Sequence, residues 1–383
     1  MCAGKFNKMK NKLSQNKLIL FFTRGVSLKT WGDMGVLSRE VSLYHSLRPY
    51  MRNIIFVTYG DASDMHYANQ LKGIRIVCNR LGLSEKWYVY ILTRIYLMMW
   101  QGQTIVKSNQ IRGADIALHA SRRFAKKFIA RCGYLHSDFI ERRSGVDSKE
   151  AVEARKLEQE VFAGADRVVV TTSAMQQEVL KRYHLPEERI IIIPNYVRTD
   201  LFHIKQESNF SNRKICFVGR LDEQKNIFAL LKAIKGLDVE LIIVGRGPLE
   251  KRLHEEVKLN KLPVCFLGNV PHQQLSEIFN SAELFVLPSY YEGHPKALLE
   301  AMSSGMPVIA TDVSGIRELI HHRETGFLCG TSSEEIREAI KIVLSDRGLC
   351  VRMGRNARNY IHQNFTLEKI VRMELALLED LTE

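Results

Sequence analysis

Residues 290–312 read YYEGHPKALLEAMSSGMPVIATD and carry two glutamates eight positions apart, ahead of a short apolar run. Glu292 falls in a loop after a predicted strand at 284–287, and Glu300 falls about one turn into the helix that follows. Both side chains are then expected above the carboxyl end of that strand, where open α/β sheets bind ligands. The alternative interpretation is a capping acid at Glu292 and a solvated helix residue at Glu300.

Short apolar runs alternate with amphipathic stretches along the whole chain, which is typical of parallel-sheet α/β architecture. Strands are expected at 18–23, 53–58, 74–78, 104–108, 127–131, 167–171 and 190–193, and again at 214–219, 239–245, 264–268, 284–287, 307–311 and 326–329. Helices are expected at 36–47, 114–124, 149–163 and 173–183. The predicted fold is therefore two Rossmann-like, doubly wound domains.

The predicted domain boundaries follow from the polar segment that interrupts the alternation of strands and helices. An N-terminal domain is expected at 1–195, a linker at 196–212 and a C-terminal domain at 213–365. The tail at 366–383 reads as a helix with Thr366 as its N-cap. The aromatic stretch at 85–100 is expected to be a buried helix, with an amphipathic helix at a membrane surface as the alternative.

The composition is that of a globular chain long enough for two domains, with 383 residues of which 45% are hydrophobic and 25% charged. The seven cysteines form no C-x-x-C pair, so a reducing cytoplasm is expected and a disulfide framework is not. Nothing resembles a secretory signal, and no apolar run reaches the roughly 18 residues of a membrane span.

The net charge of +13 is unevenly distributed. Residues 1–200 contain 32 Lys and Arg against 18 Asp and Glu, so the first half holds all of the positive excess. Such a surface suits nucleic acid, an anionic membrane or an acidic substrate, and a solvated face without a partner is the plain alternative.

Basic residues and glycines follow the strands of the second half. Gly219, Arg220 and Lys225 follow the strand at 214–219, and their charges suit a diphosphate. Gly245 ends the strand at 239–245, which alone is a weak signal because glycine often closes such turns. Leu267 and Gly268 end the strand at 264–268 in the same way, and the helix N-terminus near Lys296 and Ala297 offers N–H groups to a phosphate.

Several of these stretches together resemble one family. EGHPKALLEAMSSGMPVIATD resembles the E-x7-E signature of the retaining GT-B glycosyltransferases of family 4. PNYVRTDLF (194–202) resembles the end of that family's first domain, FVGRLDEQKN (217–226) its phosphate-binding strand and loop, and DVSGIRELI (312–320) the helix that follows. The resemblance covers most of the chain and is stronger in the second half.

The resemblance implies roles for the residues of the second half. Arg220 and Lys225 would hold the donor diphosphate, Glu300 would accept from ribose hydroxyls, and Glu292 would hold hydroxyls of the transferred sugar. The catalytic residues it implies are Arg220, Lys225 and Glu292, and the donor-binding residues are Gly35, Gly219, Gly245, Leu267, Gly268, Gly293, His294, Pro295, Lys296, Ala297 and Glu300.

This sequence departs from the family pattern at three places. Gly35 takes the place of the second glycine in the loop that closes over the donor, but Met34 stands where the first is usual. His294 stands where the family commonly carries an aromatic residue. Gly133 stands where several members have a histidine, and nearby His136 is either a substitute or a structural histidine.

The resemblance further implies the reaction and its setting. We expect a retaining hexosyltransferase with two domains facing a central cleft, the final helix packing back on the first domain, and a UDP-sugar or similar donor. No cofactor is expected, and no metal, because the sequence has no D-x-D motif. The acceptor is expected to be a glycan or lipid-linked molecule of cell-surface polysaccharide or glycolipid synthesis.

The basic first half then suits an acceptor at the cytoplasmic face of an anionic membrane, with no nucleic acid expected. The candidate acceptor-side residues are Arg112, Arg122, Arg123 and His136. Two other functions stay open at this point: a nucleotide-sugar epimerase on the same fold, and a non-catalytic partner subunit. A nicotinamide dehydrogenase is disfavoured, because no G-x-G-x-x-G follows the first strand.

Overall fold

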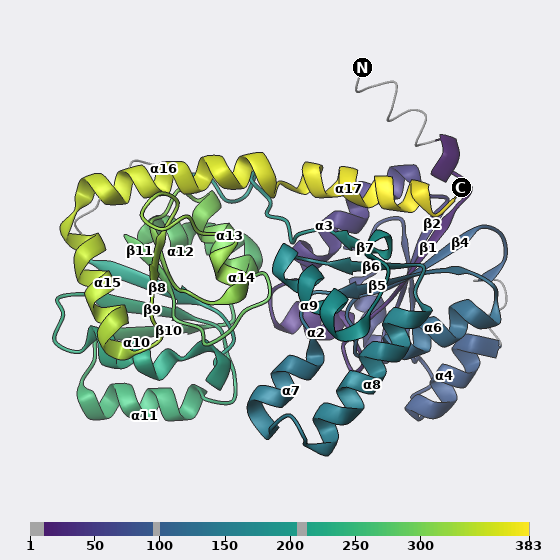
Figure 1. The fold of residues 1–383 in the computed structure, drawn as a ribbon, viewed down its shortest axis with the longest axis horizontal. Helices are drawn as coiled ribbons and strands as arrows, with labels where there is room; N and C mark the ends of the chain where they lie inside the picture. The colour runs from purple at the N-terminus through teal and green to yellow at the C-terminus, as the bar shows by residue number, and fades with distance from the viewer. Residues whose placement is uncertain (1–10, 95–99, 205–212, 383) are drawn as a thin grey trace. The chain divides into compact units, whose positions relative to one another are not determined.

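The computed structural model describes residues 11–94, 100–204 and 213–382. The chain divides into two compact units (Figure 1): Met1–Pro194 with Val371–Glu383, and Asn195–Ile370. We call these the first and the second unit. Each contains one parallel β-sheet with helices on its faces, so each is treated below as a separate doubly wound domain.

In the described residues of the first unit, seven parallel strands form one sheet in the order β3-β2-β1-β4-β5-β6-β7. The strands are β1 (Lys17–Phe21), β2 (Asn53–Val57), β3 (Ile74–Val77), β4 (Thr104–Ser108), β5 (Lys127–Cys132), β6 (Arg167–Val170) and β7 (Ile190–Ile192). The strand order reverses between β1 and β4, because β2 and β3 extend the sheet one way and β5 to β7 the other.

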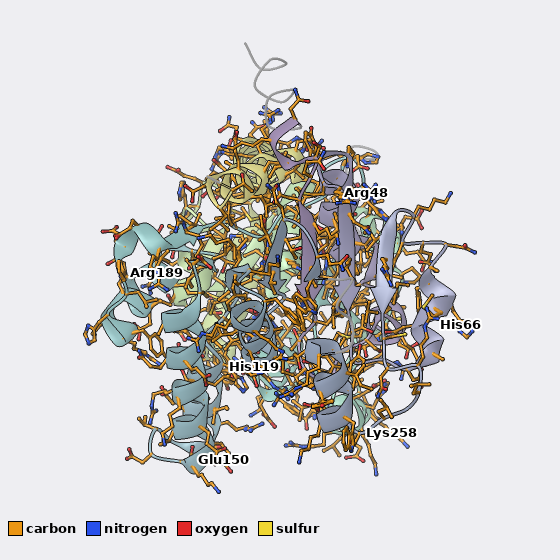
Figure 2. The ribbon with its side chains drawn as sticks, turned by 90° about the vertical axis from the view of Figure 1, so that its right-hand side faces the viewer. Arg48, His66, His119, Glu150, Arg189 and Lys258 are labelled. Carbon is orange, nitrogen blue, oxygen red and sulfur yellow. The ribbon has the colours of Figure 1, made fainter. Side chains whose placement is uncertain are left out.

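Helices α2 (Leu28–Asp33), α3 (Leu37–Leu47), α4 (Glu85–Arg94), α6 (Ala114–Arg123), α7 (His136–Ser144), α8 (Lys149–Gly164) and α9 (Ser173–Tyr183) connect these strands. On one face of the sheet, Val106 of β4 packs in one buried cluster with Leu118 of α6 and Phe162 of α8. Side-chain hydrogen bonds to the backbone fix the loops of this unit. Arg48, labelled in Figure 2, donates to the carbonyls of Met51 and Gly73 at 2.9 and 2.6 Å.

The second unit repeats the plan with six described parallel strands in the order β10-β9-β8-β11-β12-β13. The strands are β8 (Lys214–Val218), β9 (Glu240–Val244), β10 (Val264–Gly268), β11 (Leu284–Leu287), β12 (Val308–Thr311) and β13 (Phe327–Cys329). The helices are α10 (Ile227–Ile234), α11 (Glu250–Asn260), α12 (Leu275–Ser281), α13 (Lys296–Ser303), α14 (Ser314–Arg317), α15 (Ser333–Ser345) and α16 (Arg347–Asn364). Here the order reverses between β8 and β11.

Every strand predicted from the sequence is present, and the predicted α/β class with two Rossmann-like parallel sheets is confirmed. The segment predicted as a linker differs. Its first residues belong to the second unit, because Val197 pairs with Thr366 and Phe202 is fully buried in that unit's core. Residues 205–212 of the expected linker lie outside the described residues.

The aromatic stretch at 85–100 has two faces. Tyr88 and Leu92 of α4 are buried, as predicted, while Trp87 and Tyr90 are 59% and 43% exposed. Residues 95–99 lie outside the described part of the chain. No helix found in the described ranges combines the length and apolarity that crossing a membrane would require.

The final helix, α17 (Leu367–Asp380), begins in the second unit and continues into the first. The Thr366 hydroxyl accepts from the Lys369 N–H at 3.2 Å, which is the predicted N-cap. Glu374 of α17 forms an ion pair with Lys107 of β4 at 2.5 Å, and both side chains are at most 2% exposed. Burial lowers the pKa of Lys107, and the Glu374 carboxylate opposes that shift.

We predict that Glu374→Gln lowers the free energy of unfolding of the first unit by about 3–5 kcal/mol, because it leaves the Lys107 charge buried and unpaired. Urea denaturation followed by tryptophan fluorescence measures this unit selectively, since Trp31, Trp87 and Trp100, the three tryptophans of the chain, all belong to it.

The matched control is Asp33→Asn, which breaks the exposed Lys29–Asp33 pair and is expected to change stability by less than about 1 kcal/mol. The double variant Lys107→Met/Glu374→Leu should recover most of the loss. An unfolding midpoint for Glu374→Gln equal to that of Asp33→Asn would show that the buried pair does not stabilise the unit.

Candidate functional site

The candidate site lies at the carboxyl edge of the second sheet, where the strand order reverses between β8 and β11. A doubly wound sheet leaves a crevice at such a point, because the loops after the two central strands turn to opposite faces. Arg220 and Lys225 lie in the segment after β8, and Glu292 lies in the segment after β11. The structure therefore brings the three predicted catalytic residues to one edge.

Lys225 and Glu292 form an ion pair that ties these two segments together. Their side chains are only 15% and 7% exposed, so the pair is largely shielded from water. The Ser289 hydroxyl also donates to the Glu292 carboxylate, at 2.7 Å. Because Ser289 and Glu292 belong to the same loop, this bond fixes the carboxylate before any ligand binds.

Arg220 is the accessible cation of the cluster. Its side chain is 66% exposed, and its Nε lies 3.6 Å from Asp222, which is a loose contact. Burial raises the pKa of Asp222, while the charges of Lys225 and Arg220 lower it. Lys225 is matched by Glu292, so Arg220 is the cation best placed to meet an incoming anion.

Glu300 lies deeper than the sequence suggests. It is 1% exposed, and its Oε1 lies 2.8 Å from Nε2 of His272, which is equally buried. An ionised Glu300 accepts from the imidazole N–H. The carboxylate that the resemblance assigns to ribose hydroxyls is therefore buried and already has a partner in this structure.

His272 is a site residue that the sequence analysis did not single out. It begins a short 3₁₀ turn, His272–Gln274, just after β10. Its position after the carboxyl end of a strand is the one available signal, and a lone histidine there is not specific. The pairing with Glu300, 28 positions further along the chain, comes from the fold alone.

Glycines allow the loops at this edge to stack backbone against backbone. Gly245 has φ +128°, and a Cβ there would lie 2.0 Å from the carbonyl oxygen of Gly219. Gly245 also donates its N–H to the Gly268 carbonyl at 2.8 Å, so the segments after β8, β9 and β10 are in register. Leu267 is 42% exposed at the end of β10.

The segment 293–297 leads into α13, which begins at Lys296 with Pro295 as N-cap and without a side-chain cap. The N–H groups of this first turn, including that of Ala297, are suited to an anion. His294 is 6% exposed, and its ring lies 5.4 Å from that of Phe365. This histidine, which replaces the family's usual aromatic residue, therefore packs inside the unit, while the Gly293 carbonyl lies against Gly315.

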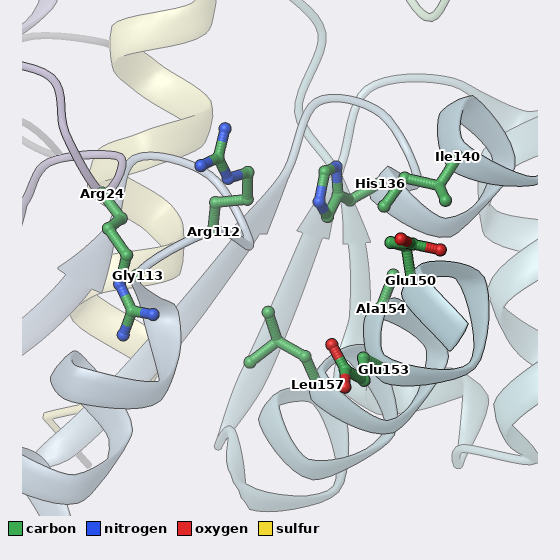
Figure 3. Close-up of a pocket in the computed structure, with 9 residues that line it drawn as sticks. All are labelled: Arg24, Arg112, Gly113, His136, Ile140, Glu150, Glu153, Ala154 and Leu157. Carbon is green, nitrogen blue, oxygen red and sulfur yellow. The ribbon is translucent and has the colours of Figure 1, made fainter. Parts of the chain in front are cut away.

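The predicted residues of the first unit do not form one cluster. Arg112 and His136 line the same crevice at the carboxyl edge of the first sheet (Figure 3). Arg122 and Arg123 lie at the far end of α6, which is ten residues and therefore about 15 Å long. Gly35, with φ +72°, follows α2 and precedes α3.

The residues that could hold a group at the second sheet's edge are thus two cations, a helix N-terminus and three glutamate or aspartate carboxylates. These carboxylates are already engaged by Lys225, His272 and Arg220. Across the described ranges, no three His, Cys, Asp or Glu side chains are grouped as metal ligands. The chemistry that the cluster offers directly is anion and hydroxyl binding.

The fold defines the class of protein. Sucrose-phosphate synthase from Thermosynechococcus elongatus matches with a TM-score of 0.81 and 20% identity, over 96% of this chain and 99% of that one. HepE from Anabaena, solved with UDP and glucose, matches with a TM-score of 0.77 and 19% identity, over 95% and 99%. Likeness at this level of identity shows the fold, which is that of the GT-B glycosyltransferases.

Two family models match the sequence, "Glycosyl transferases group 1" over residues 199–360 and "Glycosyltransferase Family 4" over residues 54–201. The chain belongs to the group 1 glycosyltransferases. N-acetyl-alpha-D-glucosaminyl L-malate synthase from Bacillus anthracis is 32% identical over 282 residues, which are 70% of this chain and 66% of that one. Other curated relatives are matched over 52–69% of their length.

We predict that Gly245→Ala destabilises the second unit by more than about 2 kcal/mol, because the new Cβ would meet the Gly219 carbonyl. The matched control is Gly236→Ala, where φ is also positive, at +72°, but nothing lies within 4 Å. That variant should show only the roughly 1–2 kcal/mol of a left-handed alanine. Hydrogen exchange of β8 and β9 measures both, and equal protection in the two variants would contradict close backbone packing at this edge.

Proposed function

We propose that this glycosyltransferase is a retaining, metal-independent enzyme that transfers a hexose from a UDP-sugar or similar donor to a glycan or lipid-linked acceptor. The observation that supports it is the shielded Lys225–Glu292 pair beside exposed Arg220, at the point where the second sheet reverses. Positive charge meets a diphosphate there, and a fixed carboxylate lies beside it to accept sugar hydroxyls.

In the proposed step, the bond between the sugar's anomeric carbon and the donor phosphate breaks, and the acceptor oxygen bonds that carbon from the same face. The departing phosphate takes the acceptor's proton, so no protein nucleophile is needed. Arg220 and Lys225 stabilise the charge that develops on the leaving diphosphate, which is the main catalytic contribution of the protein. Glu292 holds the transferred sugar.

Comparisons support the donor class at a coarse level. The matched HepE structure contains UDP and glucose, and the Bacillus anthracis relative is named for an N-acetylglucosaminyl product. We infer a nucleotide sugar for this chain, with uridine as the first base to test. The role in cell-surface polysaccharide or glycolipid synthesis rests on the family resemblance of the sequence.

The first measurement is a thermal-shift screen of UDP-, GDP- and ADP-sugars without added metal. A ligand at a hundredfold excess over its dissociation constant adds about 2.7 kcal/mol of stability. We predict that Arg220→Gln weakens binding of the best donor about tenfold or more, because it removes a charge-assisted contact. Lys341→Gln is the control, since Lys341 of α15 is 46% exposed and pairs with Glu338 of the same helix.

The reaction itself is followed by NMR of the anomeric carbon in the product. Retained configuration supports the proposal, and inverted configuration contradicts the retaining step. A donor that is converted to an isomeric nucleotide sugar without any acceptor indicates an epimerase. No stabilisation by any nucleotide sugar would favour a non-catalytic subunit.

We also propose a cytoplasmic enzyme that lies peripherally on an anionic membrane through α4. Trp87 and Tyr90 are exposed with their rings 5.6 Å apart, and Arg94 lies 4.7 Å above the Tyr90 ring. Lys86 adds a second exposed cation to this face. Exposed tryptophan and tyrosine beside basic residues suit the headgroup region of a bilayer.

We predict that Trp87→Ser/Tyr90→Ser reduces sedimentation with phosphatidylglycerol vesicles at low salt severalfold, because it removes the apolar part of the contact. Leu259→Ser is the control, since Leu259 of α11 is 79% exposed in the second unit. Vesicles of phosphatidylcholine alone should bind neither form. Failure of the unmodified protein to sediment with anionic vesicles at low salt would contradict the membrane role.

A further inference from the structure

The crevice at the carboxyl edge of the first sheet has a volume of about 240 Å³ (Figure 3). Its walls come from the segments after β1 and β4 and from helices α7 and α8. The strand order reverses between β1 and β4, so this crevice and the Lys225–Glu292 site occupy the same topological position in their two sheets. Such a position is where a doubly wound sheet binds ligands.

The wall made by the segments after β1 and β4 carries two arginines with different roles. Arg24 lies 3.0 Å from Glu85 and 2.8 Å from Asp115, so its charge is matched and it holds the wall together. The Arg112 backbone carbonyl accepts from the Arg24 N–H at 2.9 Å, but its exposed side chain makes no ion pair or hydrogen bond with any residue in the described part of the chain. Its planar fork is therefore available for a carboxylate or a phosphate.

The opposite wall presents hydrogen-bond acceptors over an apolar base. Glu150, labelled in Figures 2 and 3, and Glu153 lie in the first two turns of α8. Ionised carboxylates only accept hydrogen bonds, which matches the hydroxyl groups of a sugar or polyol. Ile140, Ala154 and Leu157 line the crevice beside them and suit the C–H face of such a molecule.

His136 also lines the crevice, and the residue that follows it, Ser137, is fixed by Glu158. The Glu158 carboxylate accepts from the Ser137 N–H at 3.0 Å and from its hydroxyl at 2.6 Å, which fixes the start of α7. Burial lowers the pKa of His136, and the charges of Arg112 and Arg143 lower it further. A neutral imidazole has one donor and one acceptor nitrogen, so it can contact a hydroxyl in either sense.

We propose that this crevice binds the acceptor and selects a small polyhydroxylated molecule that carries one carboxylate or phosphate group. The anion binds Arg112, and the hydroxyls donate to Glu150 and Glu153. A volume of 240 Å³ is below the roughly 300 Å³ where pockets for drug-sized ligands begin, so the occupant is about one monosaccharide unit. The inference rests on the proposed function, because it takes the bound molecule to be the acceptor.

The test is calorimetric titration of the full chain with four probes: D-glucuronate, D-glucose 6-phosphate, D-glucose and inorganic phosphate. At least one acidic sugar is expected to bind about tenfold more tightly than D-glucose and than phosphate, because it alone satisfies both walls. The two acidic sugars separate a carboxylate preference from a phosphate preference. Absence of binding by both would overturn the inference.

Variants assign the binding to the crevice. Arg112→Gln is expected to reduce the affinity for the acidic sugar to that for D-glucose, and Glu150→Gln/Glu153→Gln to weaken it while leaving phosphate binding unchanged. Arg75→Gln, at an exposed position of the edge strand β3, is the control. Equal effects of Arg112→Gln and Arg75→Gln would overturn the inference, as would phosphate binding as tight as that of the sugar phosphate.

Donor binding is measured on the same samples by the shift that the best nucleotide sugar causes in the unfolding temperature. An intact shift in Arg112→Gln with lost acidic-sugar binding supports the inference. An intact shift in the parent without acidic-sugar binding overturns the inference and leaves the proposed function standing. A missing shift in the parent counts against the proposed function itself.

Discussion

The ion pair between Lys225 and Glu292 is the constraint on which the ligand edge of the second unit depends. It joins the segments after the two central strands of that sheet. Because the pair is largely buried, removal of either partner would leave an unpaired buried charge and destabilise the unit. It also sets what the edge can do with a ligand. Since the Lys225 charge is matched in advance, Arg220 and the backbone N–H groups at the start of α13 supply the positive charge that is not yet paired, and they add to Lys225 in the proposed binding of a diphosphate.

The fold was predictable because buried parallel strands read as short apolar runs. β4, for example, is buried at every position and lies between two polar segments, so its first and last residues can be predicted from the sequence. The boundary between the units was less visible. Val197 and Phe202 stand in a stretch that reads as a linker, and only the pairing with Thr366 and the core around Phe202 place them in the second unit.

The candidate site was predictable where a motif spans it and unpredictable where only the fold joins its parts. Glu292 and Glu300 share one motif, yet Glu292 pairs with Lys225 after β8 and Glu300 pairs with His272 after β10. Periodicity does not report which distant residue meets a side chain, so neither partner was predictable. Arg112 and Arg123 were predicted together from one short stretch of sequence, but helix α6, about 15 Å long, separates them.

The two sheets divide their charges in the same way, and this has a physical cause. At each point of reversal one cation is matched by acids, Arg24 in the first unit and Lys225 in the second, and thereby holds the wall. Lys225 is only 15% exposed and needs its partner, because a largely buried cation without one would be unstable, whereas Arg24 is 40% exposed and is held by two acids. Arg112 and Arg220 are exposed, so their charges stay available. We infer that paired residues set the shape of each ligand edge, while a single exposed guanidinium reads the ligand's charge.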